Sequence, residues 1–338
     1  MSRSGWIIAV IACATMLAGA PAKLGAQEFY RGKTITIIVG FSPGGGFDIV
    51  ARLLSRHIGR HVPGKPDVVV TNMPGAASLT ALQYLENVAA RDGTFINTFN
   101  FGLIADSRVF PERVKVDFRK FGWIGSVNQD ISSCYTWGAL GLKTLDDVRR
   151  RPEIHMGDVG LGTSAYVGQS ILKNIFGVNV KQVLGYPGSA EQRIAIERGE
   201  LDGDCGAWVS MPPDWIDGGK INPLMRTSPI LAPGMPANVP YMADLAPDEK
   251  SRKIIQLLTS SGQLGRPFVV SPAVPADRLA TLRRAFEETM RDPEFLAEAA
   301  RLRHPVAAKT AAEALRIIEE IHDTRDDIVK PARAIAGG

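Results

Sequence analysis

One pattern constrains the fold of this chain most strongly: a β-branched run stops at a glycine-rich loop, and an amphipathic helix follows at once. Residues 34–39 (TITIIV) form such a run, and the next loop contains three consecutive glycines at 44–46. Apolar residues then recur at helical spacing over 49–58. The same succession returns within residues 68–99. Alternation of this kind predicts an α/β protein with a largely parallel sheet.

A second series of such units begins near residue 125. We expect a strand at 154–159, a glycine loop at 160–164 with a helix after it, and another helix from Ser189, where Gln192 three residues later fits a capping box. A Pro- and Gly-rich stretch then leads to a helical tail. A chain of 338 residues can hold two cores. We therefore expect two lobes: residues 27–126 plus about 250–338 form lobe 1, and residues 127–249 form lobe 2.

The first 26 residues fit a secretory signal peptide, because Arg3 precedes an apolar run and small residues that end at Ala26. The apolar run has about a dozen residues, fewer than the roughly 20 that span a bilayer. Cleavage after Ala26 would deliver the protein to the periplasm. A loosely lipoprotein-like box ending at Cys13 is the alternative.

Net charge and cysteine content limit the kinds of partner and compartment that we expect for this chain. The formal net charge is +4, and removal of residues 1–26 with their two basic groups leaves +2. Basic residues are scattered and form no aromatic-interleaved stripe, so we expect no nucleic-acid binding. We expect a monomer.

Past the expected signal peptide, the cysteines are Cys134 and Cys205. An oxidising compartment favours a disulfide between them, and two separate buried thiols are the alternative.

Both glycine loops open a helix, where free N–H groups and the helix dipole attract anions. A plain turn needs one or two glycines, whereas three at 44–46 let a ligand approach the backbone. Asp48 could cap this helix or bind an ammonium group, and we favour capping. Because ligands of open α/β sheets bind at the carboxyl ends of the strands, the loops at 44–46 and 160–164 are expected to face each other across a cleft.

Catalytic and metal-site motifs fit poorly. Neither loop has the G-x-G-x-x-G dinucleotide pattern or the Gly-Lys-Ser/Thr ending of a phosphate loop. His57 and His61 have the i, i+4 spacing of a metal pair, but arginines flank them, and a solvated helix surface explains them better. We expect no enzyme activity, no cofactor and no metal.

The motif set as a whole resembles one family. The segments YRGKTITIIVGFSPGGGFD at 30–48, NMPGAA at 72–77 and RDGT at 91–94 look like the solute-binding proteins of tripartite tricarboxylate transporters, the TctC-like or Bug family. The resemblance implies a type II periplasmic-binding-protein fold, a carboxylate held between the two loops, and delivery to a membrane permease. Phe47 stands where the family usually has a small hydroxyl residue, and Tyr166 where histidine is common.

The expected ligand contacts come from loops of both lobes. Phe47, Tyr166 and Trp208 suggest an aromatic or otherwise bulky monocarboxylate. A sensory adaptor that presents its ligand to a receptor kinase is an alternative with the same fold, and an exported hydrolase, which would need a nucleophile beside a base, is a weaker one. The expected contacts are Ser42, Pro43, Gly44, Gly45, Gly46, Phe47, Asp48, Thr98 and Asn100 in lobe 1, and Gly162, Thr163, Ser164, Tyr186, Asp204 and Trp208 in lobe 2.

Overall fold

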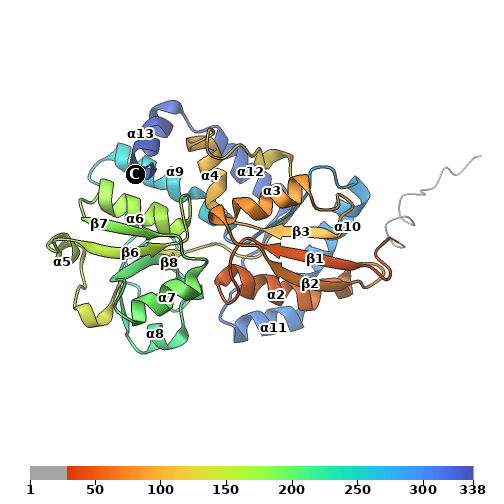
Figure 1. Cartoon of the computed structure of the whole chain (residues 1–338), viewed down its shortest axis with the longest axis horizontal. Coiled ribbons are helices and arrows are strands. Elements are labelled where there is room, and N and C mark those ends of the chain that lie inside the picture. The colour runs from red at the N-terminus through yellow and green to blue at the C-terminus, as the bar shows by residue number, and fades with distance from the viewer. Residues whose placement is uncertain (1–28, 338) are drawn as a thin grey trace, which may run out of the picture.

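The computed structural model describes residues 29–337, and it shows two α/β lobes side by side (Figure 1). The expected signal peptide and Cys13 lie outside the described residues. Lobe 1 is built on a six-stranded sheet and lobe 2 on a five-stranded sheet. Each sheet is covered by helices, so each lobe has the layered construction predicted from the alternating pattern.

The sheet of lobe 1 is mixed. Strand β1 pairs in parallel with β2 and β3, whereas β10 runs antiparallel to β3 and β4. A mainly parallel sheet was expected; β10 departs because the chain re-enters lobe 1 at the cleft and must run away from it. In spatial order the strands are β11 (Lys309–Thr310), β4 (Gly122–Ser126), β10 (Pro267–Val270), β3 (Phe95–Thr98), β1 (Thr34–Val39) and β2 (Asp67–Asn72).

The helices of lobe 1 cover this sheet with apolar faces. In α2, Leu53, Leu54 and Ile58 are buried, whereas Arg52 and Arg56 stay largely exposed, as its helical spacing predicts. The helices are α2 (Gly46–Ile58), α3 (Leu79–Asn87), α4 (Gly102–Val109), α10 (Ala276–Thr289), α11 (Pro293–Arg301) and α12 (Ala311–His322).

Lobe 2 repeats the plan with a smaller sheet. Strand β6 pairs in parallel with β7 and β8, and β5 runs antiparallel to β8 and β9. The strands in spatial order are β7 (Val180–Leu184), β6 (Ile154–Asp158), β8 (Gly203–Ala207), β5 (Ser132–Trp137) and β9 (Ile221–Arg226). The helices are α5 (Leu145–Arg149), α6 (Ser164–Asn174), α7 (Ser189–Glu197) and α8 (Pro213–Asp217).

The C-terminal part of the chain ties the lobes together. Helix α13 (Asp326–Ala336) packs against α9 (Glu249–Thr259), against α4 of lobe 1 and against α6 of lobe 2. Asn174 donates to the Ile335 carbonyl at 2.7 Å, and Arg333 donates to the Val109 carbonyl at 2.8 Å. The lobes are therefore bridged along one side. Among residues 29–337, no helix combines the length and apolar character that a membrane crossing requires.

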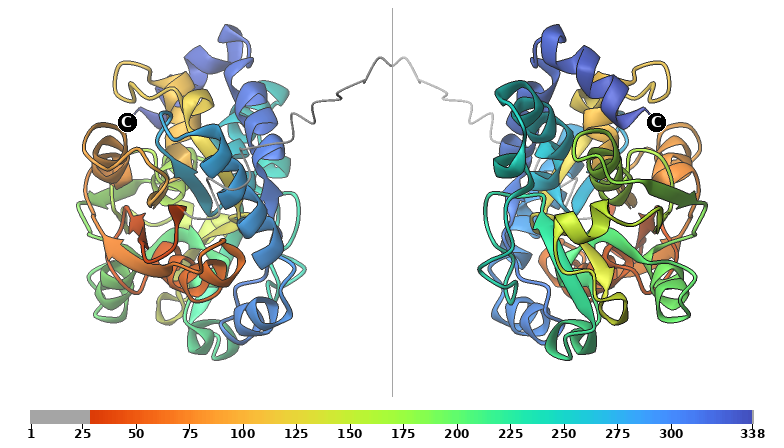
Figure 2. Two further views of the ribbon diagram at one scale, coloured as in Figure 1. Left: turned by 90° about the vertical axis from the view of Figure 1, so that its right-hand side faces the viewer. Right: turned by 90° about the vertical axis from the view of Figure 1, so that its left-hand side faces the viewer.

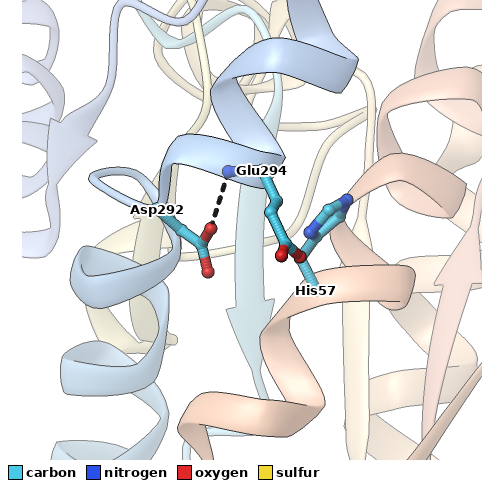
Figure 3. A group of neighbouring side chains, drawn as sticks. All are labelled: His57, Asp292 and Glu294. Atoms are coloured by element: carbon cyan, nitrogen blue, oxygen red, sulfur yellow. Dashed lines mark hydrogen bonds between the residues drawn. The ribbon is translucent and has the colours of Figure 1, made fainter.

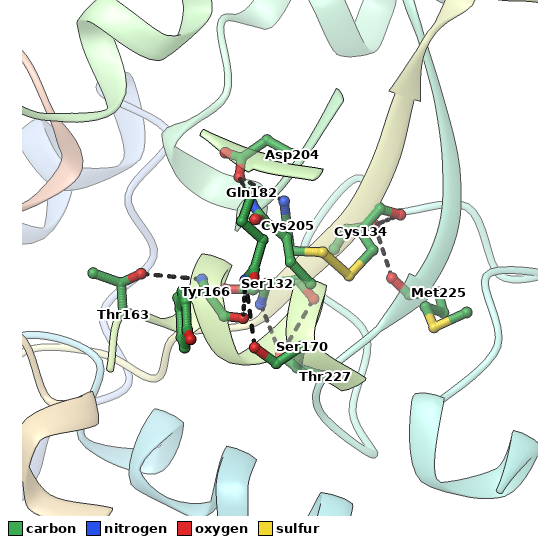
Figure 4. Close-up of a disulfide and its surroundings, with 12 residues drawn as sticks. Ser132, Cys134, Thr163, Tyr166, Ser170, Gln182, Asp204, Cys205, Met225 and Thr227 are labelled. Carbon is green, nitrogen blue, oxygen red and sulfur yellow. Dashed lines mark hydrogen bonds between the residues drawn. A yellow bond between two sulfur atoms is a disulfide. The ribbon is translucent and has the colours of Figure 1, made fainter. Parts of the chain in front are cut away.

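Cys134 and Cys205 form a disulfide, with an S–S distance of 2.09 Å. They are directly opposed on the antiparallel strands β5 and β8, and both are fully buried. Helix α6 packs on the bond through Gly168, where an added Cβ would lie 2.8 Å from the Cβ of Cys205. Figure 4 shows the bond between Cys134 and Cys205 with Tyr166 and Ser170 of this helix nearby. The bond thus joins two central strands beneath α6.

Candidate ligand-binding cleft

A cavity of about 100 Å³ lies between the lobes. Lobe 1 contributes the start of α2, the loop after β3 and Arg266 just before β10. Lobe 2 contributes the end of β6, the start of α6, part of α7 and the end of β8. The carboxyl ends of β1, β3, β6 and β8 therefore converge on one space, as expected for open α/β sheets.

The first glycine loop presents the N-terminus of α2 to this cavity. Gly44 is in the left-handed region at φ +83°, which allows the sharp entry into the helix. Gly45, Gly46 and Phe47 line the cavity, and within residues 29–337 their N–H groups donate no hydrogen bond to protein atoms. An added Cβ at Gly46 would lie 2.1 Å from Ser210 Oγ. The backbone here is open to an anion and too crowded for a side chain.

Asp48 faces away from the cavity and stabilises this loop. Its carboxylate accepts from the Gly44 N–H at 2.9 Å and pairs with Arg52 at 3.0 Å. Burial opposes ionisation, but the hydrogen bonds from Arg52, Gly44 and Asn72 together lower the pKa of Asp48. The expected capping role is not seen: Gly45 is the N-cap of α2 and has no side-chain cap, and Asp48 lies in the first helical turn, where its negative charge suits the helix dipole.

The second loop presents the N-terminus of α6 from the opposite lobe. Thr163 caps this helix by accepting from the Tyr166 N–H at 3.1 Å, and its hydroxyl donates to Asp158 at 2.5 Å. Thr163, Ser164 and Ala165 line the cavity, and Gly162 forms the lobe contact next to it. Two helix N-termini from different lobes thus open on the same space.

Helix α7 adds a third N-terminus to the cavity wall. The expected capping box at Ser189 is wrong: Gly188 is the N-cap, with no side-chain cap, and Ser189 is the first helical residue. Gly188 is required by the close approach of lobe 1, because an added Cβ would lie 2.3 Å from Ser42 Oγ. Ser189 and Gln192 line the cavity instead of capping each other.

Two arginines that the sequence analysis missed lie beside the first loop. Arg266 is 2% exposed, pairs with Asp130 at 2.9 Å and lies over the Phe47 ring at 4.3 Å. Arg193 donates to the Gly44 carbonyl at 3.3 Å and to the Ser210 carbonyl at 3.2 Å. Arg266 stands in the segment Gly265-Arg266-Pro267-Phe268, and nothing in that segment shows that the side chain reaches the cleft.

Aromatic side chains form one wall. Phe47 stacks on Phe41 with ring centroids 4.6 Å apart, and on Phe101 at 6.3 Å. All three line the cavity, together with Tyr135. The expected contribution of Tyr166 and Trp208 is not seen: neither lines the cavity, and Trp208 is 2% exposed in a core cluster with Trp215. A large ring that follows a strand end can turn into the core, and sequence does not show which way it turns.

The lobes touch directly around the cavity. Asn100 donates to the Gly162 carbonyl at 2.9 Å, and Ser42 Oγ donates to Glu191 at 3.0 Å. An added Cβ at Gly102 would lie 1.8 Å from that Gly162 oxygen. The described conformation is therefore one in which the lobes are closed on each other.

Residues 40–44 match the G-x-S-x-G string of a nucleophile elbow. Ser42, however, bonds to the carboxylate of Glu191, and in the described part of the chain no histidine is hydrogen-bonded to it. Its hydroxyl joins the two lobes.

The expected contact residues divide into two groups. Those around the cavity are Gly45, Gly46, Phe47, Asn100, Thr163, Ser164 and Asp204. Those outside its lining are Ser42, Pro43, Gly44, Asp48, Thr98, Gly162, Tyr186 and Trp208.

His57, on α2, and His61, in the short 3-10 helix that follows it, lie away from the cleft. His57 is 6% exposed, so the expectation of a solvated surface is wrong for it; its ring pairs with Glu298 of α11 at 2.5 Å. Asp292 and Glu294 lie close to His57 (Figure 3), but both carboxylates pair with Arg60. The group joins α2 to α11 by ion pairs.

Comparisons with known proteins agree with this architecture. No family model matches the chain. A UPF0065 protein of Bordetella pertussis is 26% identical over 180 residues, which are 52% of this chain and 54% of that protein. The aligned part spans about half the length of this curated relative.

Solved structures match over nearly the whole chain. Periplasmic binding protein BugD gives a TM-score of 0.69 with 19% identity, covering 90% of this chain and 97% of that one. MatC from Rhodopseudomonas palustris with bound malate gives a TM-score of 0.71 with 19% identity, covering 88% of this chain and 99% of that one. The predicted type II periplasmic-binding-protein fold is thereby confirmed. In fold, the chain is thus similar to solved proteins such as BugD, which bears the name of the Bug family that the sequence motifs resemble.

Proposed function

We propose that this protein is a periplasmic solute-binding protein that captures a small carboxylate by lobe closure, performs no chemistry on it, and delivers it to the permease of a tripartite transporter. One observation carries the proposal: the N-termini of α2 and α6, from different lobes, open on a single cavity flanked by Arg193 and Arg266. MatC, which shares the fold, was solved with the carboxylate malate.

The chain's own groups can hold a carboxylate without a metal. Its oxygens would accept from the N–H groups of Gly46 and Phe47 on one side and from Ser164 and Ala165 on the other, all of which line the cavity. Each charge-assisted hydrogen bond contributes about 1.5–3 kcal/mol, so a few of them support micromolar affinity after the cost of association.

Lobe closure would couple binding to recognition by a permease. A carboxylate shared by the two helix N-termini stabilises the closed form, because in an open form each lobe makes only half of the contacts. The change of outer surface would let a membrane partner distinguish loaded from empty protein.

The test is calorimetry of purified protein against malate, succinate and aromatic monocarboxylates, with small-angle X-ray scattering before and after addition. We expect micromolar binding of at least one acid, a smaller radius of gyration, and recovery of the ligand unchanged. Gly46→Ala should abolish binding because its methyl group would collide with Ser210 and Arg266. Turnover of the bound acid, or unaltered binding by a folded Gly46→Ala protein, would contradict the proposal.

A further inference from the structure

Two buried carboxylates line the same cavity as the anion-attracting loops. Asp158, at the end of β6, is 0% exposed, and Asp204, in β8, is 4% exposed. Oδ1 of Asp158 accepts from the Thr163 hydroxyl and, at 3.1 Å, from the Gly160 N–H, but its Oδ2 has no partner within residues 29–337. Asp204 Oδ1 accepts from the Cys205 N–H at 2.6 Å and from Gln169 at 3.3 Å.

No cationic side chain among the described residues pairs with either carboxylate. Arg266 is held by Asp130, and the hydrogen bonds of Arg193 go to Gly44, Ser189 and Ser210. Burial, together with the repulsion between the two acids, raises the pKa of Asp158 to about 8, and burial raises that of Asp204 to about 7. Buried carboxylates without a counter-charge are costly, and they favour a ligand that supplies one.

The cavity is therefore bipolar. The α2 side offers N–H groups and two guanidinium groups, whereas the β6 and β8 side offers carboxylate oxygens. The phenol of Tyr135 lies beside Asp204 on this second side, and Arg193 is the nearest positive charge. A ligand with a second carboxylate could bind here only if Asp158 and Asp204 were protonated, whereas a protonated amine would pair with their ionised form.

We infer that the ligand is an amino-acid-like zwitterion: its carboxylate binds between the helix N-termini, and its ammonium group binds Asp158 and Asp204. This inference rests on the proposed function and narrows its substrate class. Asp158 and Asp204 thereby become the residues that select aminated over unaminated acids.

The test compares matched pairs of acids by calorimetry at pH 7.5: aspartate against succinate, and phenylalanine against 3-phenylpropionate. The aminated member of the pair that fits is expected to bind at least tenfold more tightly. The Asp204→Asn and Asp158→Asn proteins should each bind the aminated acid at least tenfold more weakly than the unaltered protein does. Their affinity for the unaminated partner should stay the same or increase. Asparagine retains an acceptor for Thr163 or Cys205, so both proteins should fold, and melting curves check this.

Proton exchange on binding gives a second readout. An ammonium group favours ionised Asp158 and Asp204, so binding should release protons, measured as different binding enthalpies in phosphate and Tris buffers. A purely anionic ligand should cause proton uptake instead. If the unaminated acids bind as tightly as the aminated ones, the inference is wrong and the proposed function stands; if no acid of either kind binds, the proposed function fails and the inference with it.

Discussion

At the scale of single residues, glycine sets how closely the lobes can approach. Gly102 and Gly188 each face a group of the other lobe, and neither has a positive φ. Their backbones would therefore accept alanine in an isolated lobe. When the lobes are closed, however, neither position has room for a methyl group.

This gives a direct test of closure. Gly102→Ala is expected to lower ligand affinity at least tenfold, because its Cβ would lie 1.8 Å from the Gly162 oxygen of lobe 2. Calorimetry measures the affinity, and scattering should show a protein that stays open with ligand present. Gly160→Ala is the matched control, since its Cβ would meet nothing nearer than Ala77 at 3.7 Å. Equal affinities for the two variants would mean that the contact does not govern closure.

The buried ion pair between Arg266 and Asp130 gives a second prediction at this scale. Both side chains are almost inaccessible, at 2% and 3% exposure. Arg266→Leu should destabilise the protein by about 3–5 kcal/mol, because it leaves Asp130 buried without a counter-charge. The double replacement Arg266→Leu with Asp130→Leu should recover much of this loss. Urea denaturation measures the stability of both variants. A double variant as unstable as the single one would show that the uncompensated charge of Asp130 is not the cause of the loss.

At the scale of elements, the disulfide joins β5 to β8 directly beneath the cleft. Asp204 is adjacent to Cys205 and lines the cavity. The disulfide therefore also fixes the strand that carries Asp204 in the cavity wall. Cys134→Ser with Cys205→Ser should destabilise lobe 2 by about 2–4 kcal/mol, since the bond closes a loop of 71 residues. Denaturation of the oxidised protein and of the double-serine protein measures this. A stability unchanged by the double replacement would show that strand pairing alone holds β5 and β8.

At the scale of the whole molecule, the buried acids make stability depend on pH. Asp158 and Asp204 have folded-state pKa values near 8 and 7, above the ordinary value of 3.8, so between these values the folded protein binds more protons than the unfolded chain. The stabilisation of the fold by these two acids is complete below about pH 4 and is lost as the pH rises through 7 to 8. The melting temperature of the unliganded protein should fall from pH 6 to pH 8.5. Asp158→Asn should flatten this fall; an equally steep fall in the variant would contradict the assignment.

Other groups act in the opposite direction at low pH. Burial opposes ionisation of Asp292, but the hydrogen bond from His61 and its other partners outweigh it and lower the pKa to about 2. Such carboxylates stabilise the fold above pH 4 and lose this effect in acid. Stability should therefore be greatest in mildly acidic solution.

Much of this architecture could be predicted from local sequence. The β-branched run before Gly44 predicted β1, the spacing after it predicted α2, and the second glycine loop predicted the start of α6. Strand β9 was missed, because Pro223 lies within it and the strand is at the sheet edge, where proline is tolerated and the apolar pattern is weak. The exact lobe boundaries remain a prediction.

The chain by itself determined where helices begin beside glycine loops, because backbone geometry and apolar spacing are local properties. Only the tertiary structure decided which side chains meet in the cleft. Asp204 was expected at the cleft, but Asp158, Arg193 and Arg266 were not, because they belong to no motif. The common position of all four follows from the way two sheets close on each other. Burial, which shifts the pKa of the two acids, likewise depends on neighbours that sequence spacing does not specify.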